Sequence, residues 1–509
     1  MTRVGGVEES RKLCVIPFRT VNNSYIFDAR TGSVFASDDI INECLELYQS
    51  LEMDEIRRKL IDKYEDGEKV NSAMAFVQKM VNVKKAFYKS DEQAKEERLH
   101  IEDFNENDIK TLLYDVCMTE QMILNVTEDC NLRCKYCFFS EPYEYSRNRT
   151  TKMMTEEVAL RSLDFYFEKM AEIKKRHPGK IAAITFYGGE PLMNFDLIKK
   201  CVEYTKEKCP SVYMFNITTN GMLLKGEKAD FLYENGFSIS VSIDGNKENH
   251  DRNRVTENGS GSFDIVYNNI KEFQKKYPDY ERISLVCVYD YATKIMENDK
   301  FFEEEGLPKI TFINQVASKD TNFYDRFDEQ MQRQFIAEYQ EALNRYLSSK
   351  RDGNKSPNYI NTLFDNGAIP ALMRMGSDEI RIPFMQYTGM CVPGMKISVS
   401  ADGDFFICEK MDCSKPIGSY KTGLDYGAIV NIIKQYNRSV TTDCAYCPLY
   451  RSCSACFMTT ATRDGFQKPE CARMIEYVRT QLTIVYSVLE QNPGAYDYFT
   501  NKVEWILNR

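Results

Sequence analysis

Histidine, tryptophan and long apolar runs are scarce in this sequence. Its 509 residues include one Trp and three His, namely His100, His177 and His250. Histidine is the commonest ligand of catalytic zinc and non-haem iron, so a His-rich metal site is hard to build. No run of 18 apolar residues occurs, and the N-terminal MTRVGGVEESRKLC lacks the apolar core of a signal peptide. The sequence therefore predicts a cytoplasmic protein with no membrane partner.

Positive charge is not in excess. The 66 Lys and Arg residues face 76 Asp and Glu residues, which gives a net charge of −10 and a pI near 5.3. Nucleic-acid binding over a broad surface requires a basic face, so no nucleic-acid partner is expected. The length exceeds that of one ordinary hydrophobic core, which predicts several domains.

Cysteine, in contrast, is abundant and clustered. Of 17 cysteines, three fall between residues 130 and 137 and eight between 391 and 471. In a reducing cytoplasm disulfides are not expected, which leaves metal binding, catalysis or burial. Burial alone would scatter the cysteines along the chain. The isolated ones with apolar neighbours are interpreted as buried small residues: Cys14, Cys44, Cys117, Cys201, Cys209 and Cys287.

The first part of the chain, residues 1–90, combines strand patterns over 12–35 with helical patterns at about 38–50, 53–64 and 68–83. This order predicts a small winged-helix-like module. The alternative is that these strands and helices form no separate module and are peripheral elements of the next domain. The highly charged segment 91–118 is interpreted as a linker.

From 119 to 325, six buried strand patterns alternate with helical ones. This alternation is typical of a parallel sheet with crossover helices, and predicts an α/β fold with a partial (β/α)6 TIM-like barrel. In such barrels the chemistry sits at the carboxyl ends of the strands. Three parts follow: a helical and then irregular bridging region over 326–390, a Cys-rich domain over 391–472, and closing helices over 473–509.

The first cysteine group lies directly after the first predicted barrel strand, with Cys130, Cys134 and Cys137 in a Cys-x3-Cys-x2-Cys run. Three thiolates this close can bind one face of a four-iron cluster, which normally has four Cys ligands. One iron then stays open for a substrate or cofactor. A zinc knuckle is the alternative, but no fourth ligand is close by. The run, with Tyr136 before its last Cys, resembles the radical S-adenosylmethionine (SAM) superfamily.

The resemblance extends to other strand ends. Gly188-Gly189-Glu190 looks like the family's GGEP motif, whose glycines let backbone approach the cofactor and whose carboxylate and carbonyls receive the methionine ammonium. Arg254 matches the arginine that grips the methionine carboxylate, a pairing that can be bidentate. The other cofactor-binding positions that the resemblance implies are Tyr136, Phe139, Thr219, Asn220, Ser242, Asp244, Val286 and Val288. The alternatives are turn glycines, a surface arginine and ordinary core residues.

The second cysteine group contains Cys444, Cys447, Cys453 and Cys456, flanked by Cys391, Cys408 and Cys471. It resembles the SPASM extension, whose members carry two auxiliary four-iron clusters. The family has three residues between the last two cysteines of this quartet, whereas two stand here. A structural zinc ribbon over 444–456 is the alternative.

Position by position, the resemblance assigns an outer auxiliary cluster to Cys444, Cys447, Cys453 and Cys471. It assigns an inner cluster to Cys391, Cys408 and Cys456. The fourth iron of this cluster would be free or bound by Cys413. Three four-iron clusters and SAM are thus the expected cofactors. Glu409 occupies the place of a catalytic Asp in sulfatase maturases and could accept a substrate proton. An exposed Glu, or an ion pair with Lys410, is the alternative.

Many SPASM proteins modify ribosomally made peptides, and these often begin with a winged-helix module to which the leader peptide adds a strand. The resemblance therefore implies a peptide maturase. A 5′-deoxyadenosyl radical would take a hydrogen atom from a precursor peptide, and a Cys sulfur would then form a thioether crosslink. Reduced flavodoxin or ferredoxin would supply the electron. The alternatives are carbon–carbon or carbon–oxygen crosslinking or epimerisation, a formylglycine-forming sulfatase maturase, and a non-enzymatic peptide-binding protein stabilised by metal.

Overall fold

The computed structural model describes residues 11–140, 148–209, 213–317, 321–353, 358–372, 391–411, 415–450, 453–462 and 464–497. The chain divides into two compact units. The first unit comprises Met1–Phe104, Gly367–Met390 and Ile432–Tyr496, and the second comprises Asn105–Asn366, Cys391–Asn431 and Asp497–Arg509. Cys413 lies outside the described residues.

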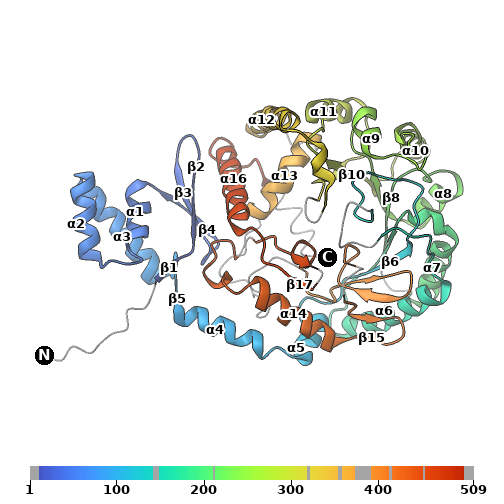
Figure 1. The fold of residues 1–509 in the computed structure, drawn as a ribbon, viewed down its shortest axis with the longest axis horizontal. Helices are drawn as coiled ribbons and strands as arrows, with labels where there is room; N and C mark the ends of the chain where they lie inside the picture. The colour runs from blue at the N-terminus through green and yellow to red at the C-terminus, as the bar shows by residue number, and fades with distance from the viewer. Residues whose placement is uncertain are drawn as a thin grey trace. The chain divides into compact units, whose positions relative to one another are not determined.

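The N-terminal part of the first unit combines a three-stranded antiparallel sheet with three helices (Figure 1). Its sheet has the order β2-β3-β4, and a separate antiparallel ribbon joins β1 to β5. The helix expected at about 38–50 begins at Asp39, and the Asp38 side chain caps it by accepting a hydrogen bond from the Ile41 amide at 2.7 Å. The elements are β1 (Arg11–Leu13), β2 (Val15–Arg19), β3 (Ser24–Asp28), β4 (Ser33–Ser37), α1 (Asp39–Leu47), α2 (Met53–Tyr64), α3 (Gly67–Lys84) and β5 (Tyr88–Ser90).

The segment expected as a linker is largely helical. Ser90 caps α4 by accepting from the Gln93 amide, and the Gln93 side chain accepts from the Ser90 amide in return. This capping box explains why so charged a stretch forms a helix instead of an open linker. The helices of this segment are α4 (Asp91–Glu102), α5 (Glu106–Thr111) and the π-helical turn η1 (Leu112–Val116).

The second unit contains the predicted partial barrel. Six parallel strands stand side by side in chain order, and the crossover helices cover their outer face (Figure 1). The strands are β6 (Gln121–Thr127), β7 (Ala182–Gly188), β8 (Tyr213–Thr219), β9 (Ser238–Ser242), β10 (Ile283–Tyr289) and β11 (Ile310–Gln315). The helical elements between them are α6 (Glu156–Arg176), η2 (Pro191–Asn194), α7 (Phe195–Lys208), α8 (Gly226–Glu234), α9 (Lys247–Asn253), α10 (Phe263–Lys276) and α11 (Ile295–Glu304).

The sheet continues beyond β6 with strands from the Cys-rich region, which the sequence did not predict. β12 (Lys396–Val399) pairs parallel to β6, and three short antiparallel strands follow it. The buried Asn125 amide fixes this junction by donating to Ser398 Oγ and the Val399 carbonyl, both at 2.9 Å. The short strands are β13 (Asp404–Phe406), β14 (Gly418–Ser419) and β15 (Gly423–Leu424).

Part of the bridging region expected to be irregular is helical. α13 spans Tyr359–Leu372 and buries Tyr359, Ile360, Leu363 and Phe364, which explains its formation by packing. The remaining elements are η3 (Phe323–Arg326), α12 (Glu329–Arg351), α14 (Tyr426–Val440), η4 (Cys444–Tyr446), α15 (Phe457–Thr460), β16 (Ala461–Thr462), β17 (Gly465–Phe466) and α16 (Cys471–Leu489). Of the closing helices predicted over 473–509, the part from residue 498 onward falls outside the described residues.

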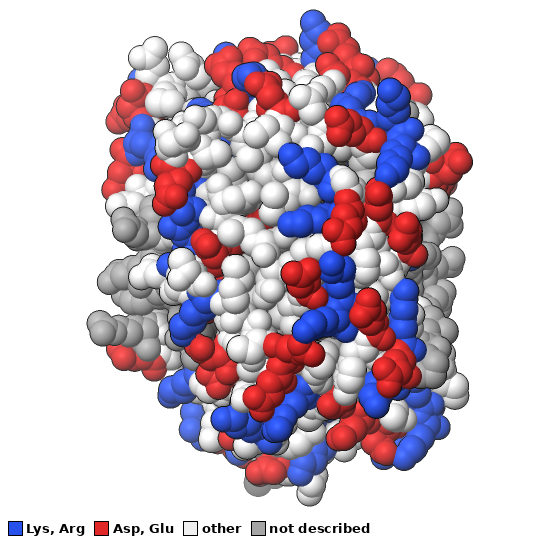
Figure 2. All heavy atoms as spheres, turned by 90° about the vertical axis from the view of Figure 1, so that its right-hand side faces the viewer, with Lys and Arg blue, Asp and Glu red and all other residues white. Residues whose placement is uncertain are grey.

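Surface composition agrees with the charge balance of the sequence. On the face shown in Figure 2, basic and acidic side chains are intermixed, without a large area of one sign. Among the described residues, no helix is both long enough and apolar enough to cross a membrane.

Candidate active site at the carboxyl ends of the barrel strands

The first cysteine group lies in the loop that follows β6. Within this loop the Leu132 amide donates to Cys130 Sγ at 3.4 Å, and the Asn220 side-chain amide reaches the same sulfur at 3.6 Å. Burial raises the pKa of the Cys130 and Cys134 thiols to about 12. Metal-free thiolates would therefore be disfavoured here, whereas bound iron would favour them by supplying positive charge. With its N–H···S contacts, the loop fits a group that binds thiolates.

Two glycines let the end of β7 approach this loop. A Cβ atom on Gly188, whose φ is +133°, would lie 2.1 Å from the Thr127 carbonyl oxygen. A Cβ on Gly189 would lie 2.0 Å from the Asp129 carbonyl oxygen. The Gly189 amide donates to Thr127 O at 2.8 Å. Side chains at both positions would separate the strand end from the cysteine loop, so the close approach requires glycine.

Glu190 makes contacts within the protein that the sequence did not reveal. Its carboxylate is fully buried and accepts from Thr219 Oγ at 2.8 Å and from the Asn220 amide at 2.7 Å. Burial raises the pKa of this carboxyl group. Glu190 therefore ties the end of β7 to the end of β8 and holds Asn220 beside Cys130. Only three-dimensional proximity, not spacing, relates Glu190 to Thr219.

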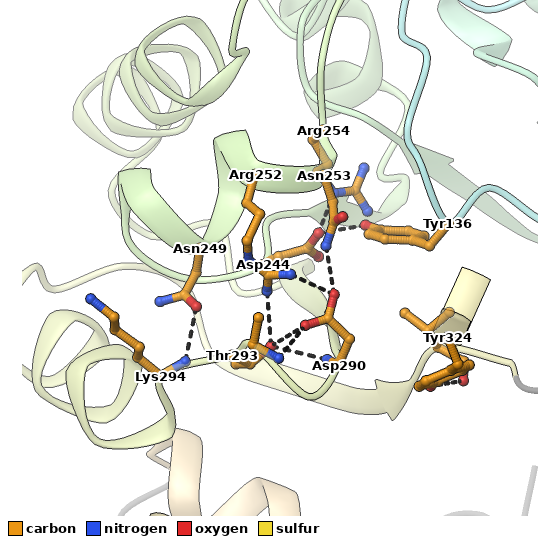
Figure 3. Close-up of polar contacts among 12 residues, drawn as sticks. Tyr136, Asp244, Asn249, Arg252, Asn253, Arg254, Asp290, Thr293, Lys294 and Tyr324 are labelled. Carbon is orange, nitrogen blue, oxygen red and sulfur yellow. Dashed lines mark hydrogen bonds and ion pairs between the residues drawn. The ribbon is translucent and has the colours of Figure 1, made fainter. Parts of the chain in front are cut away.

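A buried ion pair lies beyond the end of β9 (Figure 3). Asp244 Oδ2 is 3.0 Å from Arg254 Nε and accepts from the Tyr136 hydroxyl at 2.5 Å. Asp244 Oδ1 accepts from the Val288 amide at 3.0 Å. The Arg254 guanidinium also lies over the Tyr136 ring, 5.6 Å from its centroid. Arg254 is 7% exposed, so the surface-arginine alternative is wrong.

This geometry leaves part of Arg254 available. Its Nε is used by Asp244, whereas its two Nη groups have no hydrogen-bond partner among the described residues. Such a pair of amino groups is the donor set that recognises a carboxylate. Tyr136 belongs to the cysteine loop, so the ion pair stands next to Cys134 and Cys137.

Several residues that the sequence analysis did not select hold this arrangement. His250 Nδ1 accepts from the Asp244 amide at 3.4 Å, and Nε2 lies 2.9 Å from Ser262 Oγ. Burial lowers the pKa of His250 well below its usual value, which keeps the ring neutral and lets one nitrogen accept. At the end of β10, buried Asp290 accepts from Arg252 at 2.6 Å and from Asn253 at 2.9 Å (Figure 3). These contacts fix α9, which precedes Arg254.

The remaining predicted cofactor-binding residues lie around the same strand ends. Ser242 and Val286 are register partners on β9 and β10, and both are half-buried on the face opposite to the helix-covered core. Val288 lies two residues further along this face. Phe139 is buried beside the cysteine loop. The structure thus brings these predicted residues to one end of the barrel.

The second cysteine group surrounds a small hollow in the first unit. The hollow is lined by Val440, Cys444, Cys447, Leu449, Cys453, Ala455, Pro469, Cys471 and Met474. Amides two residues further on donate to the sulfurs of Cys447 and Cys453, each at 3.4 Å, as in the Cys130 loop. Burial raises the pKa of the Cys444 thiol to about 12 and that of Cys453 to about 11. Four thiols and apolar walls fit an iron–sulfur cluster.

A single metal ion suits the hollow less well. Within the described parts of the chain, no three Cys, His, Asp or Glu side chains converge closely enough to hold one ion. Zinc requires four donors at about 2.0–2.3 Å from one point.

The residues assigned to the inner cluster belong to different units. Cys391 and Cys408 are part of the second unit, and Cys456 is part of the first. Glu409 is half-buried in the turn after Cys408, where the Met411 amide donates to the Cys408 carbonyl at 3.1 Å. Among the described residues, no ion pair joins Glu409 to Lys410, and the role of Glu409 stays a prediction.

Comparisons with known proteins agree with the barrel site. Residues 124–297 match the model of the radical SAM superfamily. The cysteine-type anaerobic sulfatase-maturating enzyme of Clostridium novyi is 29% identical over 195 residues, which are 38% of this chain and 50% of that enzyme. Radical SAM cyclopropyl synthase TigE of Paramaledivibacter caminithermalis is 26% identical over 211 residues, 40% of this chain and 43% of the synthase. The chain thus spans about half the length of these relatives.

A solved structure shares the fold at low sequence identity. Native anSMEcpe with bound AdoMet and Cp18Cys peptide gives a TM-score of 0.54 at 18% identity, covering 74% of this chain and 99% of that one.

Proposed function

We propose that this chain, whose residues 124–297 form a radical SAM domain, is a peptide maturase that joins a Cys sulfur to a carbon of a ribosomally made precursor. The observation that carries the radical SAM part is the convergence of the Cys130–Cys137 loop, Asn220 and the Asp244–Arg254 pair at the carboxyl ends of the strands. When bound there, a four-iron cluster and SAM supply the 5′-deoxyadenosyl radical that removes a substrate hydrogen atom.

The residues of the chain orient the cofactor. Cys130, Cys134 and Cys137 would hold three irons, and the Nη groups of Arg254 would bind the methionine carboxylate. Asp244 fixes the guanidinium through Nε, so that its free donors are already oriented before SAM binds. Phe139, Ser242, Val286 and Val288 would form the adenosine side of the site.

The N-terminal module supports a peptide substrate. In the described part of the chain, β4 pairs only with β3, so its other edge presents unpaired backbone groups. A leader peptide could add a strand along Ser33–Ser37. Removing the leader from the precursor should then abolish tight binding and leave SAM cleavage intact.

A carboxylate directly after Cys408 supports the later steps. Glu409, half-buried after Cys408, could accept the proton of the substrate thiol. The auxiliary clusters would take the electron released when the thioether forms, and reduced flavodoxin or ferredoxin would deliver the initiating electron.

A sulfatase maturase that forms formylglycine is the second candidate, favoured by the similarity to the anaerobic sulfatase-maturating enzymes. Against it, these relatives carry a further cysteine between the two that correspond to Cys391 and Cys408, and this chain has none there. Carbon–carbon or carbon–oxygen crosslinking and epimerisation remain the other radical outcomes.

One experiment separates these functions. The reduced enzyme is incubated with SAM and with the short peptide encoded beside its gene, and the product mass is measured. A product about 2 Da lighter, with one thiol no longer alkylatable, is expected for a thioether. An unchanged peptide alongside active SAM cleavage would contradict the proposal. Loss of two hydrogens with every thiol still alkylatable would indicate another crosslink.

A further inference from the structure

The interior face of the barrel carries a row of hydroxyl groups one strand repeat below Ser242 and Val286. Side chains alternate between the two faces of a strand, so residues two positions apart share a face. Ser240 and Ser284 precede Ser242 and Val286 by two residues and are themselves register partners on β9 and β10. Thr218 on β8 is the register partner of Ser240. Three neighbouring strands thus present a hydroxyl at the same depth.

The row extends to both edges of the six strands. On the β11 side, Thr311 Oγ1 donates to Ser284 Oγ at 3.3 Å. On the β6 side, Asn125 and Tyr187 are register partners on β6 and β7, and Tyr187 stands level with the β8 hydroxyl. The complete row is Asn125, Tyr187, Thr218, Ser240, Ser284 and Thr311. It is polar along its whole length and contains no charged residue.

These side chains do not fill the barrel. In closed (β/α) barrels the interior is usually packed by bulky branched side chains that bury one another. Here Thr218, Ser240 and Ser284 are small and only half-buried. The hydroxyls of Thr218 and Ser240 have no hydrogen-bond partner among the described residues. The row therefore offers unused donors and acceptors to a ligand inside the barrel.

A fully buried acceptor in the same row also lacks a donor. Asn125 is 0% exposed, and its amide nitrogen donates to Ser398 Oγ and to the Val399 carbonyl. Its Oδ1 has no hydrogen-bond partner in the part of the chain that the structure describes. An unpaired buried acceptor is disfavoured. A ligand N–H at this end of the row would satisfy it.

The chemistry and dimensions of the row fit a peptide main chain. Hydroxyls donate and accept, as the amide groups of a main chain do, whereas a phosphate or carboxylate would require cationic side chains. From β8 to β11 the row crosses three strand spacings, about 14 Å, which an extended chain of about four residues covers. The row lies about 6.6 Å deeper than Ser242 and Val286, so a bound chain lies directly below the adenosine side of the site.

We propose that Thr218, Ser240 and Ser284 bind the main chain of the precursor segment that is modified, and hold it across the strands. Recognition through the main chain accepts different side chains at the neighbouring positions. The inference rests on the peptide substrate of the proposed function and assigns a site to the segment that reacts, separate from the leader strand along β4.

The first test uses the enzyme with its clusters and SAM, and the peptide encoded beside its gene. The variants T218V, S240A and T218V/S240A remove hydroxyls at nearly constant shape. Each lost hydroxyl should raise KM for the peptide about three- to tenfold, and the double variant should form fewer crosslinks per deoxyadenosine. The matched control S238A removes a hydroxyl from the same face of β9, one repeat further from the cofactor, and should change neither quantity.

Three results would overturn the inference. The first is an unchanged KM in the double variant, and the second is an equal rise in S238A. The third is weaker SAM binding by S240A, which would place the row in the cofactor site. If the double variant does not retain its iron, S240A alone decides between these outcomes.

A second probe separates this inference from the proposed function. Acetyl-tetraalanine amide, deuterated at its carbon atoms, has a main chain of the required length and no reactive thiol. The unmodified enzyme should move a deuterium atom from a probe carbon to the 5′ carbon of deoxyadenosine, and T218V/S240A should do so about tenfold less. Deuterium transfer without crosslinking of the precursor would contradict the thioether function and support the peptide site. Deoxyadenosine free of deuterium from the unmodified enzyme would overturn the peptide site.

Discussion

The Nε atom of Arg254 lies 3.0 Å from Oδ2 of Asp244, and both side chains are buried at the end of the barrel strands. The ion pair fixes the Arg254 side chain through Nε, so that the two Nη groups have a fixed orientation. A charge this deeply buried requires its partner, because an unpaired ion would be strongly disfavoured. The orientation of Arg254 therefore depends on Asp244, and in the proposed function SAM recognition depends on both.

Replacing Arg254 with Lys should weaken SAM binding. The substitution keeps the positive charge but removes the fork of two amino groups that a carboxylate can bind. Loss of one charge-assisted hydrogen bond costs about 1.5–3 kcal/mol, or roughly a 10- to 100-fold higher dissociation constant. Isothermal titration calorimetry measures the dissociation constant of SAM. The control R161K alters an arginine of α6 that pairs with the exposed Glu157 at 3.4 Å, and equal weakening in both variants would contradict the assigned role.

A methyl group on Gly189 should block assembly of the site. The Cβ of G189A would lie 2.0 Å from the Asp129 carbonyl oxygen, so the end of β7 or the cysteine loop must move. Iron bound at the Cys130 loop is expected to fall, together with deoxyadenosine formation. In the matched control G179A, nothing lies within 4 Å of the new methyl group. Normal iron content in G189A would show that this close approach is dispensable.

The outer cysteine site should account for one third of the iron. Three four-iron clusters correspond to about twelve irons per chain, and C453A should lower this number to about eight. The change removes a ligand from the hollow that Cys444, Cys447 and Cys471 also line. C287A, at a buried cysteine of β10, serves as the control, and its iron content should stay near twelve. About eight irons together with bound zinc in the unmodified protein would refute the cluster assignment.

Lys169 should make stability depend on pH. The residue is 3% exposed. Its amine has no hydrogen-bond partner among the described residues and lies 3.6 Å from the centroid of the Tyr114 ring. Burial lowers the pKa of Lys169 to about 7, below its value in the unfolded chain. The unfolded chain therefore binds more protons between these two pKa values, and this group's contribution to stability rises with pH across that interval.

The comparison with K169M isolates this contribution. The variant should be more stable than the unmodified protein near pH 7, by an amount on the order of a few kcal/mol, and this advantage should shrink toward pH 10. Denaturant unfolding across the pH series measures it. A difference that does not vary with pH would show that Lys169 titrates alike in both states.

The sequence predicted the barrel well because its signals are local. Buried strands alternating with amphipathic helices appear directly in the residue order, and the three helices of the N-terminal module follow the same rule. The helical content of 91–118 and α13 was missed, since capping at Ser90 and burial of Tyr359 depend on neighbours. The parallel pairing of β12 with β6 joins segments far apart in the chain, which no local pattern reveals.

The candidate active site also combines residues that local motifs predict with residues that only contacts in space reveal. Motif spacing selected Cys130, Cys134, Cys137 and Arg254 as candidates, because the resemblance to a family carries such positions. It gave no indication of the link from Glu190 to Thr219 or of the contact between His250 and the Asp244 amide. These residues act through contacts in space and have no fixed distance in sequence.

The central claim is that three thiolates at Cys130, Cys134 and Cys137 hold a cluster with one iron open to SAM. The most direct measurement is 5′-deoxyadenosine formed under anaerobic reducing conditions by the unmodified protein and by the triple variant C130A/C134A/C137A. Formation by the first and none by the second is predicted, with the auxiliary iron retained at about eight per chain. Undiminished deoxyadenosine formation by the triple variant would contradict the account.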